Sequence, residues 1–173
     1  MITFGCFTKR LTRSILDNNT TTSLWRGLSP GSSCYMYTST STTKSSSGKQ
    51  VISTTQAPAA LGAYSQAIKA NGQIFVSGCL GLDPITMKYP SDTDVELQAQ
   101  QALENMKYVL EAGGSSMSKV VKTTILLKDI NDFAKVNNVY SKYFTVDPPA
   151  RSTFAVRDLP KNGLVEIEAI ALE

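Results

Sequence analysis

The chain has 173 residues, of which 42% are hydrophobic, a size and composition that predict one globular domain of ordinary size with a further segment. The sequence contains no histidine, which excludes serine–histidine triads, histidine general bases and most zinc and non-haem iron sites. The formal net charge of +3 is uneven, because six of the 17 Lys and Arg residues precede residue 51 together with a single acid, Asp17, whereas 11 basic and 13 acidic residues follow.

The body of the chain, from residue 51 onward, is therefore slightly acidic. We expect no nucleic-acid partner, because phosphate binding requires a clustered basic face. No run of about 18 apolar residues is present, so we expect no membrane-spanning segment. Only one of the three cysteines, Cys79, lies in the body, where no internal disulfide can then form. Cys79 has no CxxC partner and is predicted to be a small buried residue rather than a nucleophile.

Residues 1–48 are rich in Ser and Thr and have few apolar clusters that could hold a fold. An apolar stripe at spacings of three and four residues, with basic residues offset from it, is formed by Phe4, Phe7, Leu11 and Ile15 beside Lys9, Arg10 and Arg13. A basic amphipathic helix followed by a polar tail is typical of a mitochondrial transit peptide. We therefore expect a protein of the mitochondrial matrix whose leader is cut between residues 28 and 49. The alternative is a disordered cytosolic tail.

The domain proper is predicted over residues 49–173. It begins with a short strand at residues 51–53, followed by a loop at residues 57–63 that contains proline and glycine. Two further strands flank Asn71-Gly72, and both of these residues tolerate the positive φ of a type I′ turn. The sequence therefore predicts a β-hairpin at residues 64–77 and a loop at residues 78–92.

Thr93 and Glu96 match a capping box, which predicts a helix that starts at this point and ends at a Gly-Gly pair at residues 113–114. The β-branched residues 119–128 predict a strand, and Asp129 or Asn131 can cap a second helix. One apolar face is predicted for that helix, formed by Phe133, Val136, Tyr140 and Phe144.

Residues 148–156 begin with two prolines, which are incompatible with a helix at this point. The β-branched, aromatic and small residues that follow predict a strand. Alternation predicts a core face and an outward face, formed respectively by Ser152, Phe154 and Val156 and by Arg151, Thr153 and Ala155. Arg151 would then point away from the core with a planar fork of donors suited to a carboxylate or a phosphate. The alternative is a surface arginine at the end of a strand.

A turn at residues 161–163 precedes a last strand at residues 164–172. Its core face and its outward face are formed respectively by Val165, Ile167, Ala169 and Ala171 and by Glu166 and Glu168. The whole pattern predicts an α+β domain, a mixed six-stranded sheet with two helices on one face. The other sheet face has nothing in the chain to cover it, which favours symmetric self-association. On that uncovered face we expect Arg151, Thr153, Glu166 and Glu168.

Four blocks of the body occur in an order that is more specific than any single element: APAALGAYSQAIKANGQIFVSG, VVKTTILLKDINDFAKVNNVYSKYF, PPARSTFAV and VEIEAIAL. Through these blocks the domain resembles, from about residue 51 to its end, the RidA/YjgF family of reactive-intermediate imine deaminases, and within it the mitochondrial fungal-type members. The resemblance implies a homotrimer with clefts between neighbouring subunits, and a hydrolysis that uses no cofactor and no metal.

The resemblance also implies the substrates, which are 2-iminobutanoate and 2-iminopropanoate with their enamine tautomers. Pyridoxal-phosphate-dependent serine and threonine dehydratases release these small 2-imino and 2-enamino acids. Hydrolysis gives 2-keto acids and ammonia, and would protect mitochondrial pyridoxal-phosphate enzymes and the isoleucine branch of branched-chain amino acid synthesis.

Single positions carry the resemblance further. Arg151 corresponds to the carboxylate-binding arginine, Glu166 to the glutamate that works with water, and Tyr64 to the tyrosine that lines the cleft. The other substrate-binding positions implied are Ser77, Gly78, Asn137 and Thr153. Thr153 stands where cysteine is common in the family, so no role for a thiol at that position is expected.

Several alternatives stay open. Without the resemblance, Tyr64 is interpreted as a hairpin core residue and Asn137 as a solvent-facing one, and alternation does not say which of Glu166 and Glu168 handles water. A chorismate-mutase-like enzyme would need a second cation beside Arg151. A non-catalytic mitochondrial regulator that binds 2-keto acids, or a genome-maintenance factor, is the alternative outside enzymes. A ribonuclease is disfavoured by the acidic body and the missing histidines.

Overall fold

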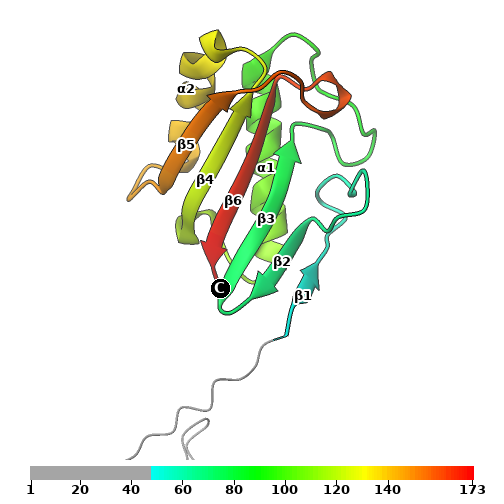
Figure 1. Cartoon of the computed structure of the whole chain (residues 1–173), viewed down its shortest axis with the longest axis vertical. Helices are drawn as coiled ribbons and strands as arrows, with labels where there is room; N and C mark the ends of the chain where they lie inside the picture. The colour runs from blue at the N-terminus through cyan, green and yellow to red at the C-terminus, as the bar shows by residue number, and fades with distance from the viewer. Residues whose placement is uncertain (1–47) are drawn as a thin grey trace, which may run out of the picture. The chain divides into compact units, whose positions relative to one another are not determined.

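The computed structural model describes residues 48–173, and the predicted transit peptide lies outside these described residues apart from its last position. Six strands form one sheet in the order β1-β2-β3-β6-β4-β5 (Figure 1). They are β1 (Gln50–Ile52), β2 (Ala67–Ala70), β3 (Gln73–Leu80), β4 (Val120–Leu127), β5 (Ala150–Ala155) and β6 (Val165–Leu172). Neighbouring strands run antiparallel except β4 and β5, which are parallel, so the sheet is mixed as predicted.

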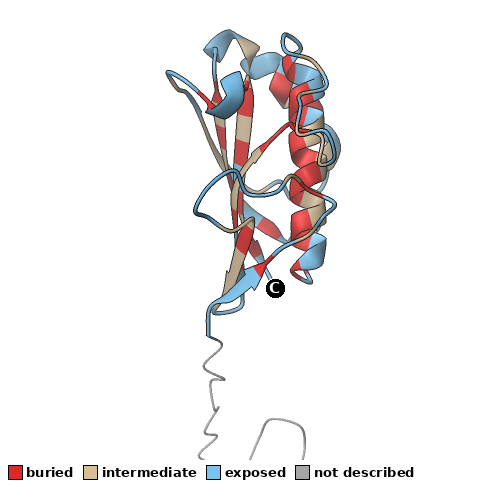
Figure 2. Ribbon diagram, turned by 90° about the vertical axis from the view of Figure 1, so that its right-hand side faces the viewer, coloured by how far each residue is buried: buried red, intermediate tan, exposed pale blue. Residues whose placement is uncertain are grey.

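Two α-helices, α1 (Val95–Ala112) and α2 (Phe133–Tyr143), cover the same face of this sheet. Three 3₁₀ turns, at Met117–Lys119, Ile130–Asp132 and Pro160–Asn162, complete the elements. Buried residues gather between the sheet and α1 (Figure 2), and they include the predicted core face of β6, Val165, Ile167, Ala169 and Ala171. The α+β prediction is confirmed. Among the described residues, no helix is both long and apolar enough to cross a membrane.

The hairpin between β2 and β3 has the predicted turn. Asn71 and Gly72 have φ values of 53° and 74°, the positive values that a type I′ turn requires at both positions. β3 extends to Leu80, beyond the predicted end at residue 77, and its pairing with β6 shifts register between Val76 and Cys79. This β-bulge lies at Ser77 and Gly78 and redirects the strand there.

α1 begins one residue later than the sequence predicts. The N-cap of α1 is Asp94, whose Oδ1 accepts hydrogen bonds from the amides of Glu96 at 2.9 Å and Leu97 at 3.3 Å. The predicted capping box at Thr93 is therefore wrong by one residue, since Asp and Thr are both strong N-caps and only one can hold the first turn. The predicted end of α1 is confirmed, with Gly113 as C-cap.

β5 presents the opposite faces from those predicted. Phe154 was expected in the core and is 57% exposed, whereas Arg151 and Thr153 were expected outside and lie under α2. Period-two alternation separates the two faces of a strand but does not say which one a helix covers. On the uncovered face Phe154 is in register with Leu126 and, through β4, with Glu166. Glu166 and Glu168 lie on the uncovered face as predicted, because their β6 neighbours are buried.

Because Phe154 lies on the uncovered face of β5, its removal should affect stability less than the removal of a core residue. Leu103→Ala, at a fully buried position, should lower the free energy of unfolding by about 2–5 kcal/mol, because it leaves a cavity in the core. Phe154→Ala should lower it by less than about 1 kcal/mol in dilute protein. Urea unfolding at several protein concentrations measures both. A larger loss for Phe154→Ala that does not depend on concentration would place Phe154 in the core after all.

Candidate active site

Arg151 is held by one face of α2. Its Nη1 donates a hydrogen bond to Asn137 Oδ1 at 2.9 Å, and its guanidinium carbon lies 4.8 Å from the ring centroid of Tyr140 and 5.6 Å from that of Phe133. The three partners share one helix face because they are spaced four and three residues apart. Such distances are those of cation–π contacts. We call Arg151, Asn137, Thr153 and the two rings the arginine half-site.

This half-site keeps polar groups free. Arg151 and Thr153 line a shallow depression between the sheet and α2. Thr153 Oγ1 is buried there and has no hydrogen-bond partner among the described residues. Within residues 48–173, no carboxylate lies within ion-pair distance of Arg151. The guanidinium therefore retains donors for an anion from outside this part of the chain.

A second group of predicted site residues gathers at the bulge of β3. Tyr64, Ser77, Gly78 and Glu166 form what we call the glutamate half-site. The Glu166 carboxyl lies directly against the Gly78 backbone, so that any side chain at Gly78 would overlap it. Gly78 is needed for this close approach and not for a positive φ. The bulge thus opens the space in which the Glu166 carboxyl lies.

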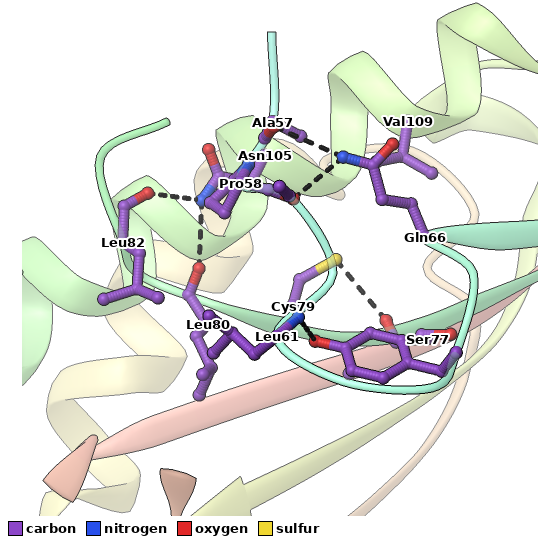
Figure 3. Close-up of a pocket in the computed structure, with 13 residues that line it drawn as sticks. Ala57, Pro58, Leu61, Gln66, Ser77, Cys79, Leu80, Leu82, Asn105 and Val109 are labelled. Atoms are coloured by element: carbon purple, nitrogen blue, oxygen red, sulfur yellow. Dashed lines mark hydrogen bonds between the residues drawn. The ribbon is translucent and has the colours of Figure 1, made fainter. Parts of the chain in front are cut away.

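Figure 3 shows the hollow beside this half-site, which is open to solvent. Tyr64 lines it from the loop before β2, and Ser77 and Gly78 line it from β3. Tyr64 Oη accepts a hydrogen bond from the Leu61 amide at 3.0 Å, and Ser77 Oγ donates to the Ser65 carbonyl at 2.7 Å. The Ser77 hydroxyl therefore holds the loop with its proton, which leaves its oxygen lone pairs and the Tyr64 hydroxyl proton for a ligand.

Two amides that the sequence analysis missed fix the walls of this hollow (Figure 3). Gln66 Nε2 donates to the carbonyls of Thr54, Ala57 and Pro58 at 3.0, 3.2 and 2.8 Å, and so binds the loop before β2. Asn105 Nδ2 donates to the carbonyls of Leu80 and Leu82 at 2.9 and 2.8 Å. Asn105 is 1% exposed on α1, and its helical spacing from the apolar residues Ala102 and Val109 was the signal that could have found it.

Burial also sets the protonation of this half-site. Burial raises the pKa of Glu166 above its usual value, and the charge of Glu168 raises it further. Burial and the nearby Glu166 raise the pKa of Cys79 to about 12, so the thiol stays protonated and is no nucleophile. The raised pKa instead makes Glu166 a stronger base than an ordinary carboxylate, which suits it to take up and return a proton.

One copy of the chain does not bring the two half-sites together. Glu166 lies on β6 and Arg151 on β5, and β4 lies between them, a distance of about 10 Å across the sheet at the usual strand spacing. Along β4 the two are also offset, since Arg151 is in register with Thr123 and Glu166 with Leu126. Arg151 lies on the helix-covered face and Glu166 on the uncovered face. The structure unites Arg151 with Asn137 and Thr153, and Glu166 with Gly78, but not Arg151 with Glu166.

Comparison with known proteins identifies the relatives of this domain. Residues 54–173 match the family model described as Endoribonuclease L-PSP. The chain is 54% identical over 135 residues to Reactive Intermediate Deaminase A, chloroplastic, of Arabidopsis thaliana, covering 78% of this chain and 72% of the relative. It is 49% identical over 125 residues to 2-iminobutanoate/2-iminopropanoate deaminase of Capra hircus, covering 72% of this chain and 90% of the relative.

Among solved structures, E. coli TdcF with bound serine superposes with a TM-score of 0.68 at 38% identity, covering 72% of this chain and 98% of that one. The fold is thus that of a domain with relatives in bacteria, plants and animals. The chain belongs to the Endoribonuclease L-PSP family, the family of the RidA/YjgF deaminases.

Proposed function

We propose that this chain hydrolyses 2-iminobutanoate and 2-iminopropanoate, with their enamine tautomers, to 2-keto acids and ammonia. Arg151 carries the proposal, because its guanidinium is held by Asn137 and two rings and pairs with no carboxylate within residues 48–173. Such a cation suits a small carboxylate. Support comes from the plant and goat relatives, which are named as deaminases, and from TdcF, whose ligand is an amino acid.

In the proposed reaction, Arg151 binds the substrate carboxylate and thereby places the imine carbon. Glu166 takes a proton from water as the water oxygen bonds to that carbon and passes it to the nitrogen, which gives a carbinolamine. Glu166 then takes the proton of the new hydroxyl group and delivers it to the nitrogen, so that the C–N bond breaks, ammonia leaves and the keto group forms. A carboxyl group with a raised pKa is suited to both transfers. Thr153 Oγ1 and the Tyr64 hydroxyl supply further hydrogen bonds to substrate or water.

The complete site is formed, in this proposal, between two subunits of a homotrimer. The arginine half-site of one copy faces the glutamate half-site of the next, because Arg151 and Glu166 of one copy lie on opposite faces of the sheet, on strands that β4 separates, where one four-carbon substrate cannot contact both. The uncovered sheet face supports this arrangement, since Phe75, Phe154 and Leu172 are 43–57% exposed on it and a second copy would bury them.

The activity can be tested with the full chain and a threonine dehydratase that generates the imine in the presence of semicarbazide. Semicarbazide traps the imine that escapes hydrolysis, so the protein should slow semicarbazone formation in proportion to its concentration. Serine as the dehydratase substrate tests the three-carbon imine in the same way. A semicarbazone rate equal to that of the dehydratase alone would reject the hydrolase. Calorimetric binding of 2-oxobutanoate by such an inactive protein would favour the 2-keto-acid-binding regulator instead.

A mixing experiment tests the shared cleft. Arg151→Ala and Glu166→Gln should each be inactive alone, but co-expressed mixed trimers should recover up to about a quarter of wild-type activity. The reason is that some clefts then combine an intact Arg151 from one copy with an intact Glu166 from its neighbour. Mixed samples that stay as inactive as the single variants, while light scattering shows trimers, would place both residues of each site in one copy.

The proposed setting is the mitochondrial matrix, where pyridoxal-phosphate enzymes that form isoleucine precursors release these imines. The support is the basic, Ser/Thr-rich sequence of residues 1–48, together with a relative whose name places it in another organelle, the chloroplast. Cell fractionation of the tagged full chain tests the location. A cytosolic signal of full-length mass would reject both the leader and the setting.

Ribonuclease activity is the second candidate, favoured by the description of the family model. The chain has no histidine, and its acidic residues outnumber its basic ones after residue 51, so the proposed site has the groups for imine chemistry rather than for RNA cleavage. Incubation of the same preparation with RNA at several salt concentrations distinguishes the two. Cleavage that Arg151→Ala abolishes would favour the ribonuclease.

A further inference from the structure

Arg151 reaches its position through α2, and the three α2 side chains that hold it differ in kind. Asn137 accepts one guanidinium hydrogen bond at 2.9 Å. Phe133 contributes a ring at 5.6 Å but is itself 41% exposed. Tyr140 lies closer, at 4.8 Å, and is 5% exposed, so it is the buried surface against which the guanidinium rests. A cation–π contact is stronger where water is excluded.

The Tyr140 ring is itself fixed from two directions. Its hydroxyl is hydrogen-bonded to Thr123 Oγ1 at 2.8 Å, and Thr123 is fully buried on β4, in direct register with Arg151 on β5. Its ring packs against Phe144 with centroids 4.4 Å apart. Burial raises the pKa of Tyr140, so the phenol is neutral at physiological pH and keeps its hydrogen bond to Thr123.

We propose that Tyr140 is a positioning residue of the arginine half-site, whose ring face holds the Arg151 guanidinium in the orientation that receives the substrate carboxylate. Arginine has a long flexible stem, and an unsupported guanidinium would have to be ordered by each substrate that binds. The Tyr140 ring orders the guanidinium before substrate binds. The kinetic consequence rests on the proposed function, whereas the contact itself is testable without it.

Tyr140→Leu and Tyr140→Phe separate the ring from the hydroxyl. Because Arg151 binds the carboxylate before and during the reaction, Tyr140→Leu should raise KM about tenfold while kcat changes less than about threefold. Tyr140→Phe keeps the ring and its packing, and should stay within about threefold of wild type in KM. Equal defects in the two variants, or a fall in kcat with an unchanged KM, would overturn the positioning role.

Tyr143→Leu is the matched control, because it removes another tyrosine ring from α2. The Tyr143 hydroxyl donates to Glu104 Oε1 at 2.9 Å, away from Arg151. This variant should lose stability without a change in KM. If Tyr143→Leu raised KM as much as Tyr140→Leu, the effect would belong to helix stability and the proposed role of the ring would fall.

An NMR measurement on the full chain makes the test independent of catalysis. In wild type and Tyr140→Phe, the Nε–Hε proton of Arg151, assigned by its absence in Arg151→Lys, should be shifted upfield by the ring current. In Tyr140→Leu it should move toward the ordinary arginine position. A signal unchanged in Tyr140→Leu overturns the inference. A shifted wild-type signal in a protein that neither hydrolyses imines nor binds 2-oxobutanoate would reject the proposed function and leave the positioning role intact.

Discussion

Arg151→Ala should lower kcat/KM for imine hydrolysis at least about 100-fold and leave the subunit folded. A bidentate, charge-assisted contact to a carboxylate contributes about 1.5–3 kcal/mol, and its loss also removes the placement of the imine carbon. The Arg151→Ala variant should fold normally because Arg151 forms no ion pair within residues 48–173, so no buried carboxylate is left unpaired. Steady-state kinetics and circular dichroism measure the two effects.

Two controls make the Arg151 result specific. Arg151→Lys keeps the charge but loses the planar fork, and should have intermediate activity. Arg157→Ala removes a cation from the same region whose side chain is 97% exposed and only weakly paired with Asp158, and it should have wild-type activity. Loss of assembly in Arg151→Ala would instead identify Arg151 as a structural residue of the interface.

Glu166→Gln should lower kcat by about 10²–10⁴-fold, the usual contribution of general acid–base catalysis. Glutamine keeps the shape and the hydrogen-bonding capacity of the side chain against Gly78, so the defect reports the lost proton transfer. Glu168→Gln is the matched control on the same strand face. It should keep its activity, but shift the acid limb of the pH profile of kcat/KM to lower pH, because Glu168 helps to raise the pKa of Glu166. The reverse pattern would assign the water to Glu168.

Glu166→Gln should also be more stable than wild type at pH 7. Burial raises the pKa of Glu166 in the folded protein, so the folded state holds this proton more tightly than the unfolded chain does. The stabilisation is complete below the unfolded pKa and is lost as the pH rises through the folded one. Glutamine cannot ionise, so the gap in melting temperature should appear at pH 7 and close below about pH 4. A gap of constant size would mean that charge is not its cause.

Local signals predicted most elements because their causes are local. Asn71-Gly72 fixes the hairpin through positive φ, and Gly113-Gly114 ends α1. The faces of β5 could not be predicted in this way, since they depend on where α2 lies. Polarity alone assigns the strand face that carries Arg151 to the solvent. In the structure α2 covers this face and contributes an amide and two aromatic rings that suit a cation.

The candidate site was predictable as a set of residues but not as an arrangement. Family blocks indicated Arg151, Asn137 and Glu166, and nothing in their sequence order says that Arg151 and Glu166 lie on opposite faces of the sheet with β4 between their strands. Tyr140 was predicted as a core residue from its helical spacing, and it is one. The same spacing places it beside Asn137 on the helix face, so its contact with Arg151 could have been inferred only once β5 was placed under α2.

The separation of Arg151 and Glu166 onto opposite sheet faces has a consequence for regulation by dosage. If neighbouring copies complete each cleft, a lone subunit is catalytically silent, and activity switches on with assembly rather than with synthesis. Specific activity should then fall when the protein is diluted below the dissociation constant of the assembly. A subunit without Arg151 still supplies Glu166 to its neighbour, so a heterozygous loss of Arg151 would remove about half of the clefts in randomly mixed trimers, and normal subunits would keep their activity beside a defective one.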